Sequence, residues 1–376
     1  TALAETFGAD VQAIEEVWHG LTPPYRELFA WLEGRAARPE VESTAVFRPL
    51  MLAQPLEDED AESLDVASYR AEWKWDGIRV QLVAGEGTAR IFSRTGEEIT
   101  GTFPEIAEAM TFRGVLDGEL LVVRGGEVAP FNDLQQRLNR KRVSAKLLKD
   151  YPAHVRLYDL LIQDGVDLRD LGFDDRRARL AAWHERVQPQ RMDVSPLLEV
   201  EGLDDLRALR DDARRRGIEG LMLKRADSPY IAGRPKGDWY KWKRDPLTVD
   251  AVLMYAQRGH GKRSSYYSDY TFGVWQPDPE GTGWQLVPVG KAYFGFSDQE
   301  LRQLDKFVRD NTVERYGPVR AVAPELVLEI AFDAVHRSTR HKSGLAMRFP
   351  RVARIRWDKP AAEADTLAAL EALRED

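Results

Sequence analysis

Lys74 is the strongest candidate for a catalytic group in this sequence. It stands between Trp73 and Trp75, just before a predicted strand at Ile78–Val83. A lysine amine that is partly desolvated and close to other cations loses its proton more easily, and the neutral amine can attack an electrophile. The same residues also fit an ordinary lysine whose ammonium group reaches water from the edge of a strand. One short motif does not separate these two interpretations.

Acidic, basic and aromatic residues recur in a fixed order further along the chain. Glu119 and Glu219 supply carboxylates, which suit Mg²⁺, and Lys241 and Lys243 share one face of a strand, where they would neutralise phosphate. Tyr158 offers a ring on which a base can stack. Each residue also has a plainer interpretation: strand charges that block edge pairing, lysines that face solvent, or a tyrosine in the core.

In their order, these segments resemble the nucleotidyltransferase motifs of the covalent lysyl-nucleotidyltransferase superfamily. They are most similar to ATP-dependent DNA ligases of the bacterial single-chain kind. The resemblance covers roughly residues 46–360, and six ordered motifs are far more specific than one. The matching segments are Lys74-Trp75-Asp76-Gly77-Ile78-Arg79 (motif I), Asp117-Gly118-Glu119 (motif III), Leu157-Tyr158-Asp159 (motif IIIa), Glu219-Gly220-Leu221-Met222-Leu223-Lys224 (motif IV), Lys241-Trp242-Lys243 (motif V) and Arg348-Phe349-Pro350-Arg351 with the basic residues that follow (motif VI).

The resemblance implies a role for each matching residue. Lys74 would attack the α-phosphate of ATP and carry AMP, while Glu72 would read the adenine amino group and Tyr158 would stack on the base. Glu119 and Glu219 would place Mg²⁺ or Mn²⁺. The other implied contacts are Arg79 and Glu119 with the ribose and reacting phosphate, Arg94 with phosphate including the nick 5′-phosphate, Arg234 with phosphate, Lys241 and Lys243 with the α-phosphate, and Arg348 and Arg351 with the β- and γ-phosphates when the C-terminal domain closes.

The elements that position these residues suggest an α+β fold. Strands are predicted at 78–83, 88–92, 115–123 and 155–162, with helices near 103–111, 131–149, 174–186 and 203–216. After residues 245–246, five short strands and a helix near 298–309 fit a small OB-type barrel. The resemblance implies a nucleotidyltransferase (ATP-grasp-like ligase adenylation) domain at 46–246 and an OB-fold domain with a C-terminal helix at 247–376. Residues 1–45 would be a helical remnant of a mostly missing N-terminal DNA-binding domain.

Composition narrows the alternatives. The 376 residues contain no cysteine, which excludes disulfides, thiolate metal sites and cysteine nucleophiles. The net charge of −8 argues weakly against nucleic acid as a partner, but basic stretches at 137–149, 258–263 and 337–359 are candidate contacts with a DNA backbone. Residues 259–262 lack the spacing of a Walker A loop. We expect a monomer that acts on nicked double-stranded DNA in the bacterial cytoplasm, in association with the nucleoid and without a membrane partner.

Three other functions stay open at this point. An RNA ligase or a GTP-using capping enzyme would share motif I, although motifs IV and VI favour a DNA ligase. An NAD⁺-dependent ligase is disfavoured, because such ligases resemble a longer chain with cysteine zinc ligands. A non-catalytic OB-fold nucleic-acid-binding protein would bind DNA without forming a covalent nucleotide.

Overall fold

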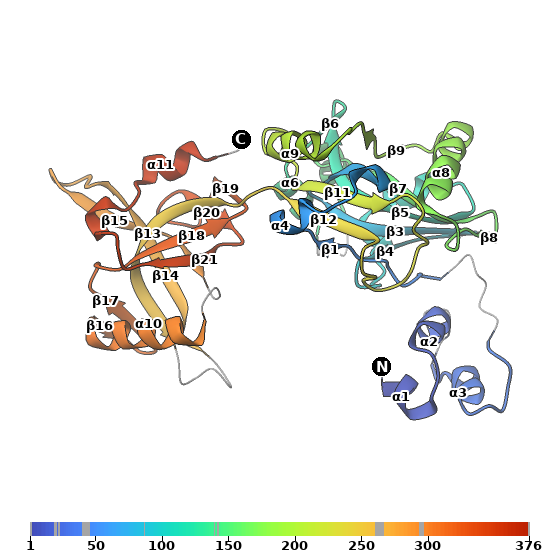
Figure 1. Cartoon of the computed structure of the whole chain (residues 1–376), viewed down its shortest axis with the longest axis horizontal. Coiled ribbons are helices and arrows are strands. Elements are labelled where there is room, and N and C mark those ends of the chain that lie inside the picture. The colour runs from blue at the N-terminus through green and yellow to red at the C-terminus, as the bar shows by residue number, and fades with distance from the viewer. Residues whose placement is uncertain are drawn as a thin grey trace. The chain divides into compact units, whose positions relative to one another are not determined.

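The computed structural model describes residues 2–18, 21, 23–39, 46–85, 87–138, 140, 143–259, 267–292 and 297–374. The chain divides into two compact units, residues 1–244 and 245–376. The division falls beside the Asp245-Pro246 pair at which the sequence changes character. Figure 1 shows the elements of each unit.

Three short helices begin the first unit. Their apolar faces meet in a small cluster that includes Ile14, Val17 and Leu28. The helices are α1 (Ala2–Phe7), α2 (Val11–Trp18) and α3 (Arg26–Leu32). The assignment of residues 1–45 to the remnant of a DNA-binding domain stays a prediction.

Two β-sheets form the rest of the first unit. The larger has the strand order β4-β3-β5-β7-β8, with β6 and β9 added to β5 and β7, and the smaller has the order β1-β12-β11-β2-β10. Strands of the larger sheet are β3 (Ile78–Gly85), β4 (Thr88–Ser93), β5 (Gly114–Arg124), β6 (Glu127–Val128), β7 (Ala153–Gln163), β8 (Val166–Asp167) and β9 (Met192–Val194). Strands of the smaller sheet are β1 (Gln54–Pro55), β2 (Tyr69–Lys74), β10 (Leu197–Leu198), β11 (Gly220–Arg225) and β12 (Trp239–Lys243).

Helices cover these sheets. Helix α8 (Phe173–Val187) packs on β7 and β9, and α9 (Leu203–Asp212) packs on β11 (Figure 1). The apolar cluster of the larger sheet includes Leu180 and Trp183 of α8, and that of the smaller sheet includes Leu206 of α9. The remaining helical segments are α4 (Asp58–Ala61), α5 (Pro104–Ala109), α6 (Phe131–Gln135), α7 (Ala145–Asp150) and the 3₁₀ turns η1 (Val66–Ser68) and η2 (Thr100–Thr102).

The prediction of one helix over residues 131–149 is wrong. Two short helices, α6 and α7, stand in its place, and the second begins where the Ser144 hydroxyl accepts from the Leu147 N–H. Arg137 turns inward between them and is fully buried. Its guanidinium donates to both carboxylate oxygens of Glu105, at 2.7 and 3.0 Å, and to the Tyr151 carbonyl at 2.8 Å. Arg137 therefore holds the fold together and is not available to DNA.

The second unit is an OB-fold domain. The long strand β13 pairs with β14, β17 and β18, so one strand connects both parts of a curved sheet. Its strands are β13 (Leu247–Arg258), β14 (Tyr267–Pro277), β15 (Trp284–Ala292), β16 (Thr312–Tyr316), β17 (Val319–Val322), β18 (Val327–Phe332), β19 (Ala334–Arg337), β20 (Leu345–Arg348) and β21 (Arg351–Arg356). Its helical segments are α10 (Asp298–Asp310), η4 (Ala361–Glu363) and α11 (Leu367–Ala372).

The sequence predicted five of these strands and missed β16, β17, β19 and β20. Strand β16 is almost wholly exposed, so it lacks the apolar alternation that marks a strand. Helix α10 begins with a capping box between Ser297 and Glu300. Within the described residues, no helix is long and apolar enough to cross a membrane.

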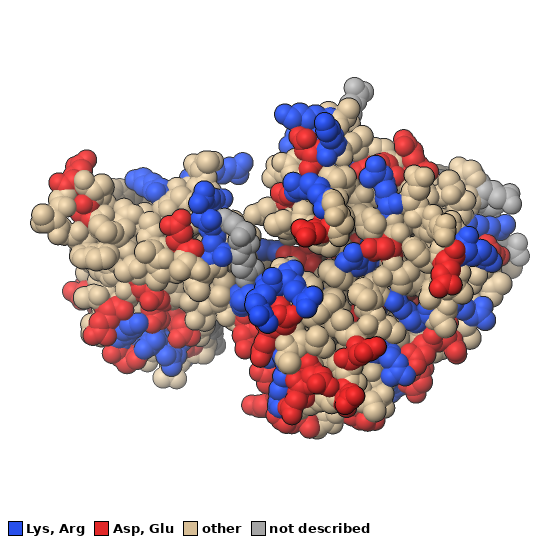
Figure 2. Space-filling view, turned by 90° about the horizontal axis from the view of Figure 1, so that it is seen from above, with Lys and Arg blue, Asp and Glu red and all other residues tan. Residues whose placement is uncertain are grey.

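Acidic and basic side chains are interspersed over the face shown in Figure 2. The net charge of −8 therefore does not form one continuous acidic surface on that face. Local groups of charges, and not the sum, decide what each part of the surface can bind.

Candidate active site

Lys74 ends strand β2 beside an acidic residue from the start of β11. Its Nζ atom contacts the carboxylate of Glu219, and the Glu219 N–H donates to the Lys74 carbonyl at 3.0 Å. The two side chains are 22% and 17% exposed, so a ligand can reach them. Gly220 lies opposite Lys74 with a φ of +142°, and a Cβ there would lie 2.2 Å from the Trp242 carbonyl oxygen. Only glycine allows the strands to hold the lysine and glutamate this closely.

Glu119 approaches Lys74 from the other sheet. The turn between β2 and β3 brings the sheets together at Gly77, where a Cβ would lie 2.4 Å from the Leu120 carbonyl oxygen and 2.8 Å from Glu119 Cγ. Burial raises the pKa of Glu119 to about 8, although the charges of Lys74 and Arg79 lower it and that of Glu219 raises it further. The structure therefore brings together the two carboxylates predicted to place a metal ion.

A fixed network holds Arg79 in β3 behind these carboxylates. Its Nη2 atom donates to Asp117 at 2.6 Å and to the Tyr230 hydroxyl at 3.0 Å, and its Nη1 atom donates to the Met51 carbonyl at 2.6 Å. The Tyr230 hydroxyl in turn donates to Asp117 at 2.5 Å. Asp117 is fully buried, so its carboxylate needs the positive charge of the Arg79 guanidinium as a partner. The guanidinium carbon also lies 5.9 Å from the centre of the Tyr158 ring.

A buried ion pair also lies close to Tyr158. Glu72 Oε2 is 2.5 Å from the Nζ atom of Lys224, and the two side chains are 3% and 2% exposed. The ammonium lies 4.5 Å from the Tyr158 ring centre, 4.9 Å from that of Phe173 and 4.7 Å from that of Trp239. Burial lowers the pKa of Lys224, while the charge of Glu72 raises it.

One carboxylate oxygen of Glu72 is left without a hydrogen-bond donor, which favours a ligand that can supply one. Glu72 Oε1 is buried and has no hydrogen-bond partner among the described residues, and Arg177 Nη1 lies 3.7 Å from it. A buried acceptor without a donor is costly in a folded protein unless a ligand supplies one. An exocyclic amino group on a base stacked against Tyr158 would supply that donor. The geometry thus fits the predicted roles of Glu72 and Tyr158.

Four more cations share this site with Lys74. Burial lowers the pKa of Lys241, and the positive charges of Arg234, Lys74, Lys243 and Arg94 lower it further. Lys243 Nζ is 3.7 Å from Glu219 Oε2. Because Lys241 and Lys243 lie opposite Met222 and Gly220 in the neighbouring strand, β12 carries them beside motif IV. A polyphosphate would relieve this repulsion between cations.

The two carboxylates fit a magnesium ion that is also bound by phosphate. Mg²⁺ keeps several waters and takes one or two carboxylates together with substrate oxygens. Glu119 and Glu219 supply that number. No group of three or more His, Asp or Glu side chains suited to a metal occurs within the described ranges. A site for metal with nucleotide fits better than a metal cage made wholly of protein.

Arg348 and Arg351 belong to the second unit. The Arg348 guanidinium carbon lies 5.2 Å from the Phe349 ring centre, and Arg351 Nη1 lies 3.4 Å from Asp333 Oδ1. Their predicted contact with the β- and γ-phosphates stays a prediction.

Sequence reasoning missed several residues of this site. Lys224 closes motif IV and was not assigned a role, and Arg177 and Tyr230 lie outside the motifs. The sequence pointed to such residues only indirectly. Glu72 and Asp117 are acids inside apolar strands, and each requires a buried counter-charge whose identity the sequence does not give.

The buried ion pair allows a test that separates stability from nucleotide use. We expect Glu72→Ala to destabilise the fold by about 3 to 5 kcal/mol, because it leaves the Lys224 ammonium buried and unpaired. The double variant Glu72→Met with Lys224→Met should recover much of that stability and still fail to use ATP. Thermal unfolding and transfer of label from ATP measure the two effects. Full ATP use by a stable double variant would contradict a role in reading the base.

Comparisons with known proteins agree with this geometry. Residues 50–243 match the family model described as ATP dependent DNA ligase domain, and residues 263–359 match the ATP dependent DNA ligase C terminal region. A probable DNA ligase of Koribacter versatilis is 38% identical over 352 residues, which cover 87% of this chain and 60% of that protein. DNA ligase 1 of Korarchaeum cryptofilum is 30% identical over 381 residues, which cover 100% of this chain and 68% of that protein. The chain thus spans about two thirds or less of these relatives.

Solved structures support the fold. A structure of a Lig E DNA ligase has a TM-score of 0.57 at 21% identity and covers 83% of this chain and 100% of its own. The structure named Pmar-Lig_Pre. has a TM-score of 0.63 at 19% identity and covers 83% of this chain and 68% of its own. The predicted α+β architecture, a nucleotidyltransferase domain followed by an OB fold, is confirmed. On these matches, the chain belongs to the ATP-dependent DNA ligase family.

Proposed function

We propose that this chain is the catalytic region of an ATP-dependent DNA ligase that seals nicks between a 5′-phosphate and a 3′-hydroxyl in double-stranded DNA. The observation that carries the proposal is the convergence of Lys74 with Glu119, Glu219 and Lys241 where the two sheets meet. A nucleophilic amine among carboxylates and cations suits attack on a phosphate ester. We also expect the protein to act as a monomer in the bacterial cytoplasm, in association with the nucleoid.

The first step would be attack by Lys74 Nζ on the α-phosphorus of ATP. The nitrogen loses a proton, the N–P bond forms, and the bond from the α-phosphorus to the bridging oxygen breaks to release pyrophosphate. Lys241 and Lys243 would neutralise the phosphate oxygens, and Arg94 and Arg234 would add positive charge to the same field. A magnesium ion held by Glu119 and Glu219 would supply further charge neutralisation.

The next two steps would move AMP and then release it. A 5′-phosphate oxygen of the nick attacks the phosphorus of the lysyl adenylate, the N–P bond breaks, and Lys74 recovers its amine. The 3′-hydroxyl then loses its proton, attacks the 5′-phosphorus, and expels AMP. The cations that held the α-phosphate would serve in each step, because each step passes through a charged phosphorus centre.

The choice of nucleotide follows from the base site. Glu72 Oε1 is an acceptor, and it suits the exocyclic amino group of adenine better than the carbonyl of guanine. Tyr158 would stack on the ring, and Lys224 holds Glu72 in place. This arrangement favours ATP over GTP, and hence a ligase over a capping enzyme.

The test is sealing of a duplex with a single labelled nick in the presence of Mg²⁺ and ATP, GTP or NAD⁺. We expect sealing with ATP and a marked loss with the other two donors. An otherwise identical RNA nick separates a DNA ligase from an RNA ligase. Binding of nicked DNA without sealing under any donor would overturn the proposal and favour a non-catalytic OB-fold protein.

The raised pKa of Glu119 gives a pH-dependent stability that can be measured without metal. The unfolded chain ionises this carboxyl near the ordinary glutamate pKa of 4.5, whereas the folded chain holds the proton up to about pH 8. The folded state therefore binds more protons between these values, and its stability falls as pH rises through them. We expect Glu119→Gln to remove this fall in the free energy of unfolding with rising pH. Denaturant unfolding of both proteins at about pH 5, 7 and 9 with chelator tests it, and parallel curves would contradict the assignment.

A further inference from the structure

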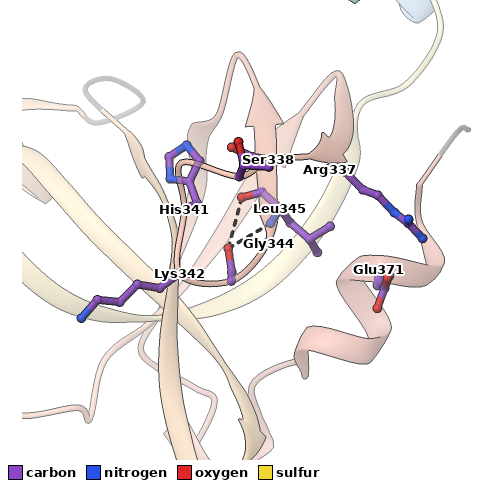
Figure 3. A pocket seen from close by; sticks show the side chains of 9 residues that line it. Arg337, Ser338, His341, Lys342, Gly344, Leu345 and Glu371 are labelled. Atoms are coloured by element: carbon purple, nitrogen blue, oxygen red, sulfur yellow. Dashed lines mark hydrogen bonds between the residues drawn. The ribbon is translucent and has the colours of Figure 1, made fainter.

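A pocket in the second unit lies apart from the residues that the motifs assign. It has a volume of about 580 Å³ and is formed by the hairpin loop between β19 and β20 and by α11 (Figure 3). Cations and hydroxyl groups line most of it. The cations are Arg337 and Lys342, the hydroxyl groups belong to Ser338, Thr339 and Ser343, and the His341 ring lies among them.

The cations of this loop differ from those of the neighbouring strand. Along β21, Arg351, Arg354 and Arg356 all have acidic neighbours within 4 Å, at Asp333, Glu329 and Asp250. Arg337 and Lys342 have no ion pair among the residues that the structure describes, and both side chains are exposed. The one carboxylate of the pocket, Glu371, already has a cation, Arg374, at 3.2 Å. The loop thus carries positive charge that the domain itself does not neutralise.

The loop has a defined shape before any ligand binds. Its ends are joined by a hydrogen bond from the Ser338 N–H to the Gly344 carbonyl at 2.7 Å, and the Gly344 N–H donates to the His341 carbonyl at 3.0 Å. Gly344 has a φ of +74°, which a side chain would strain. The Ser343 hydroxyl donates to the Leu345 carbonyl at 3.1 Å. A ligand that binds here does not first have to order the loop.

The arrangement of the cations favours an extended polyanion over a single ion. Figure 3 shows Arg337 reaching toward α11, whereas Lys342 extends from the opposite side of the loop. Cations that point to different sides suit successive phosphates of a strand. No Phe, Tyr or Trp side chain is among the described residues that line the pocket, so charge and hydroxyl groups dominate what it offers a nucleic acid.

We propose that the β19–β20 loop pocket binds the phosphodiester backbone of the DNA substrate, away from the adenylylation site and without contact to the bases. The proposal rests on the proposed ligase function, since it names where the nicked duplex is held. Of the basic stretch 337–359, it assigns DNA contact to the loop cations Arg337 and Lys342 in particular. The paired arginines of β21 belong to the internal ion pairs of the domain.

The test compares the full chain with the double variant Arg337→Ala/Lys342→Ala. The matched control is Arg302→Ala/Arg315→Ala, which removes two exposed arginines from α10 and β16 of the same unit and leaves the same net charge. Affinity for a labelled nicked duplex is measured by anisotropy between about 50 and 200 mM salt. We expect the pocket variant to bind about ten-fold more weakly at low salt, with a salt slope smaller by about 1 to 2. The control should stay close to the unmodified chain.

Several outcomes would overturn the proposal. One is a pocket variant that binds DNA like the unmodified chain or like the control. Another is a variant that keeps its DNA affinity but loses binding of inorganic tripolyphosphate or loses lysyl-AMP formation, because the pocket would then serve a free phosphate or nucleotide. Failure of the ligase function itself would show separately, as an unmodified chain that binds DNA but takes no label from ATP. Thermal unfolding confirms that both variants are folded.

Discussion

Replacing Lys74 by arginine is expected to abolish transfer of AMP from ATP to the protein. Arginine keeps the positive charge beside Glu219, so the ion pair and the fold should survive. The guanidinium stays protonated at any pH at which the protein folds, so it cannot act as a nucleophile. We expect labelling by α-labelled ATP to fall below detection, a loss of at least about 1,000-fold.

The same variant should keep part of the third step. Joining a nick that already carries AMP on its 5′-phosphate does not need the amine, only the cations around the phosphate. We expect Lys74→Arg to seal such a nick at a measurable rate, and Lys306→Ala on α10 to behave like the unmodified chain in both assays. Continued labelling of Lys74→Arg would contradict the assignment of the nucleophile.

The second large effect is expected at Glu219. Its carboxylate contacts Lys74, lies 3.7 Å from Lys243 and raises the pKa of Glu119, so a single charge affects the nucleophile, the phosphate cations and the predicted metal ion. Glu219→Gln keeps the size of the side chain and removes the charge. We expect lysyl-AMP formation to slow by about 100-fold or more, which is the usual cost of removing one electrostatic partner in an active site.

A matched control is Glu108→Gln on α5, an exposed glutamate outside the motifs. Raising the Mg²⁺ concentration should restore part of the rate of Glu219→Gln and none of that of Lys74→Arg, because only the first variant weakens metal binding. A Glu219→Gln enzyme with an unchanged rate would remove this residue from the mechanism.

Most of the motif residues could be placed from sequence because they lie on regular strands, although the strand that Lys74 ends was not predicted. Lys74 ends β2, Glu119 lies inside β5, and Lys241 and Lys243 alternate along β12. The apolar alternation of those strands is visible locally, and strand direction fixes which side chains share a face.

The burial of Lys224 and Arg137 could not be predicted, because it depends on partners that are distant in the sequence. Lys224 pairs with Glu72 across 152 positions, and Arg137 with Glu105 across 32. No local pattern says that a lysine near the end of an apolar strand turns into the core, or that one arginine of a basic stretch does the same. In both cases an ion pair and surrounding aromatic rings stabilise burial that the composition alone would not suggest.

Locating the covalent nucleotide tests whether Lys74 is the nucleophile. The full chain is incubated with α-labelled ATP and Mg²⁺, denatured, digested and mapped by mass spectrometry. We expect acid-labile AMP on the peptide that contains Lys74, and on no other peptide. AMP on a different residue, or a folded chain that takes no label at all, would contradict it.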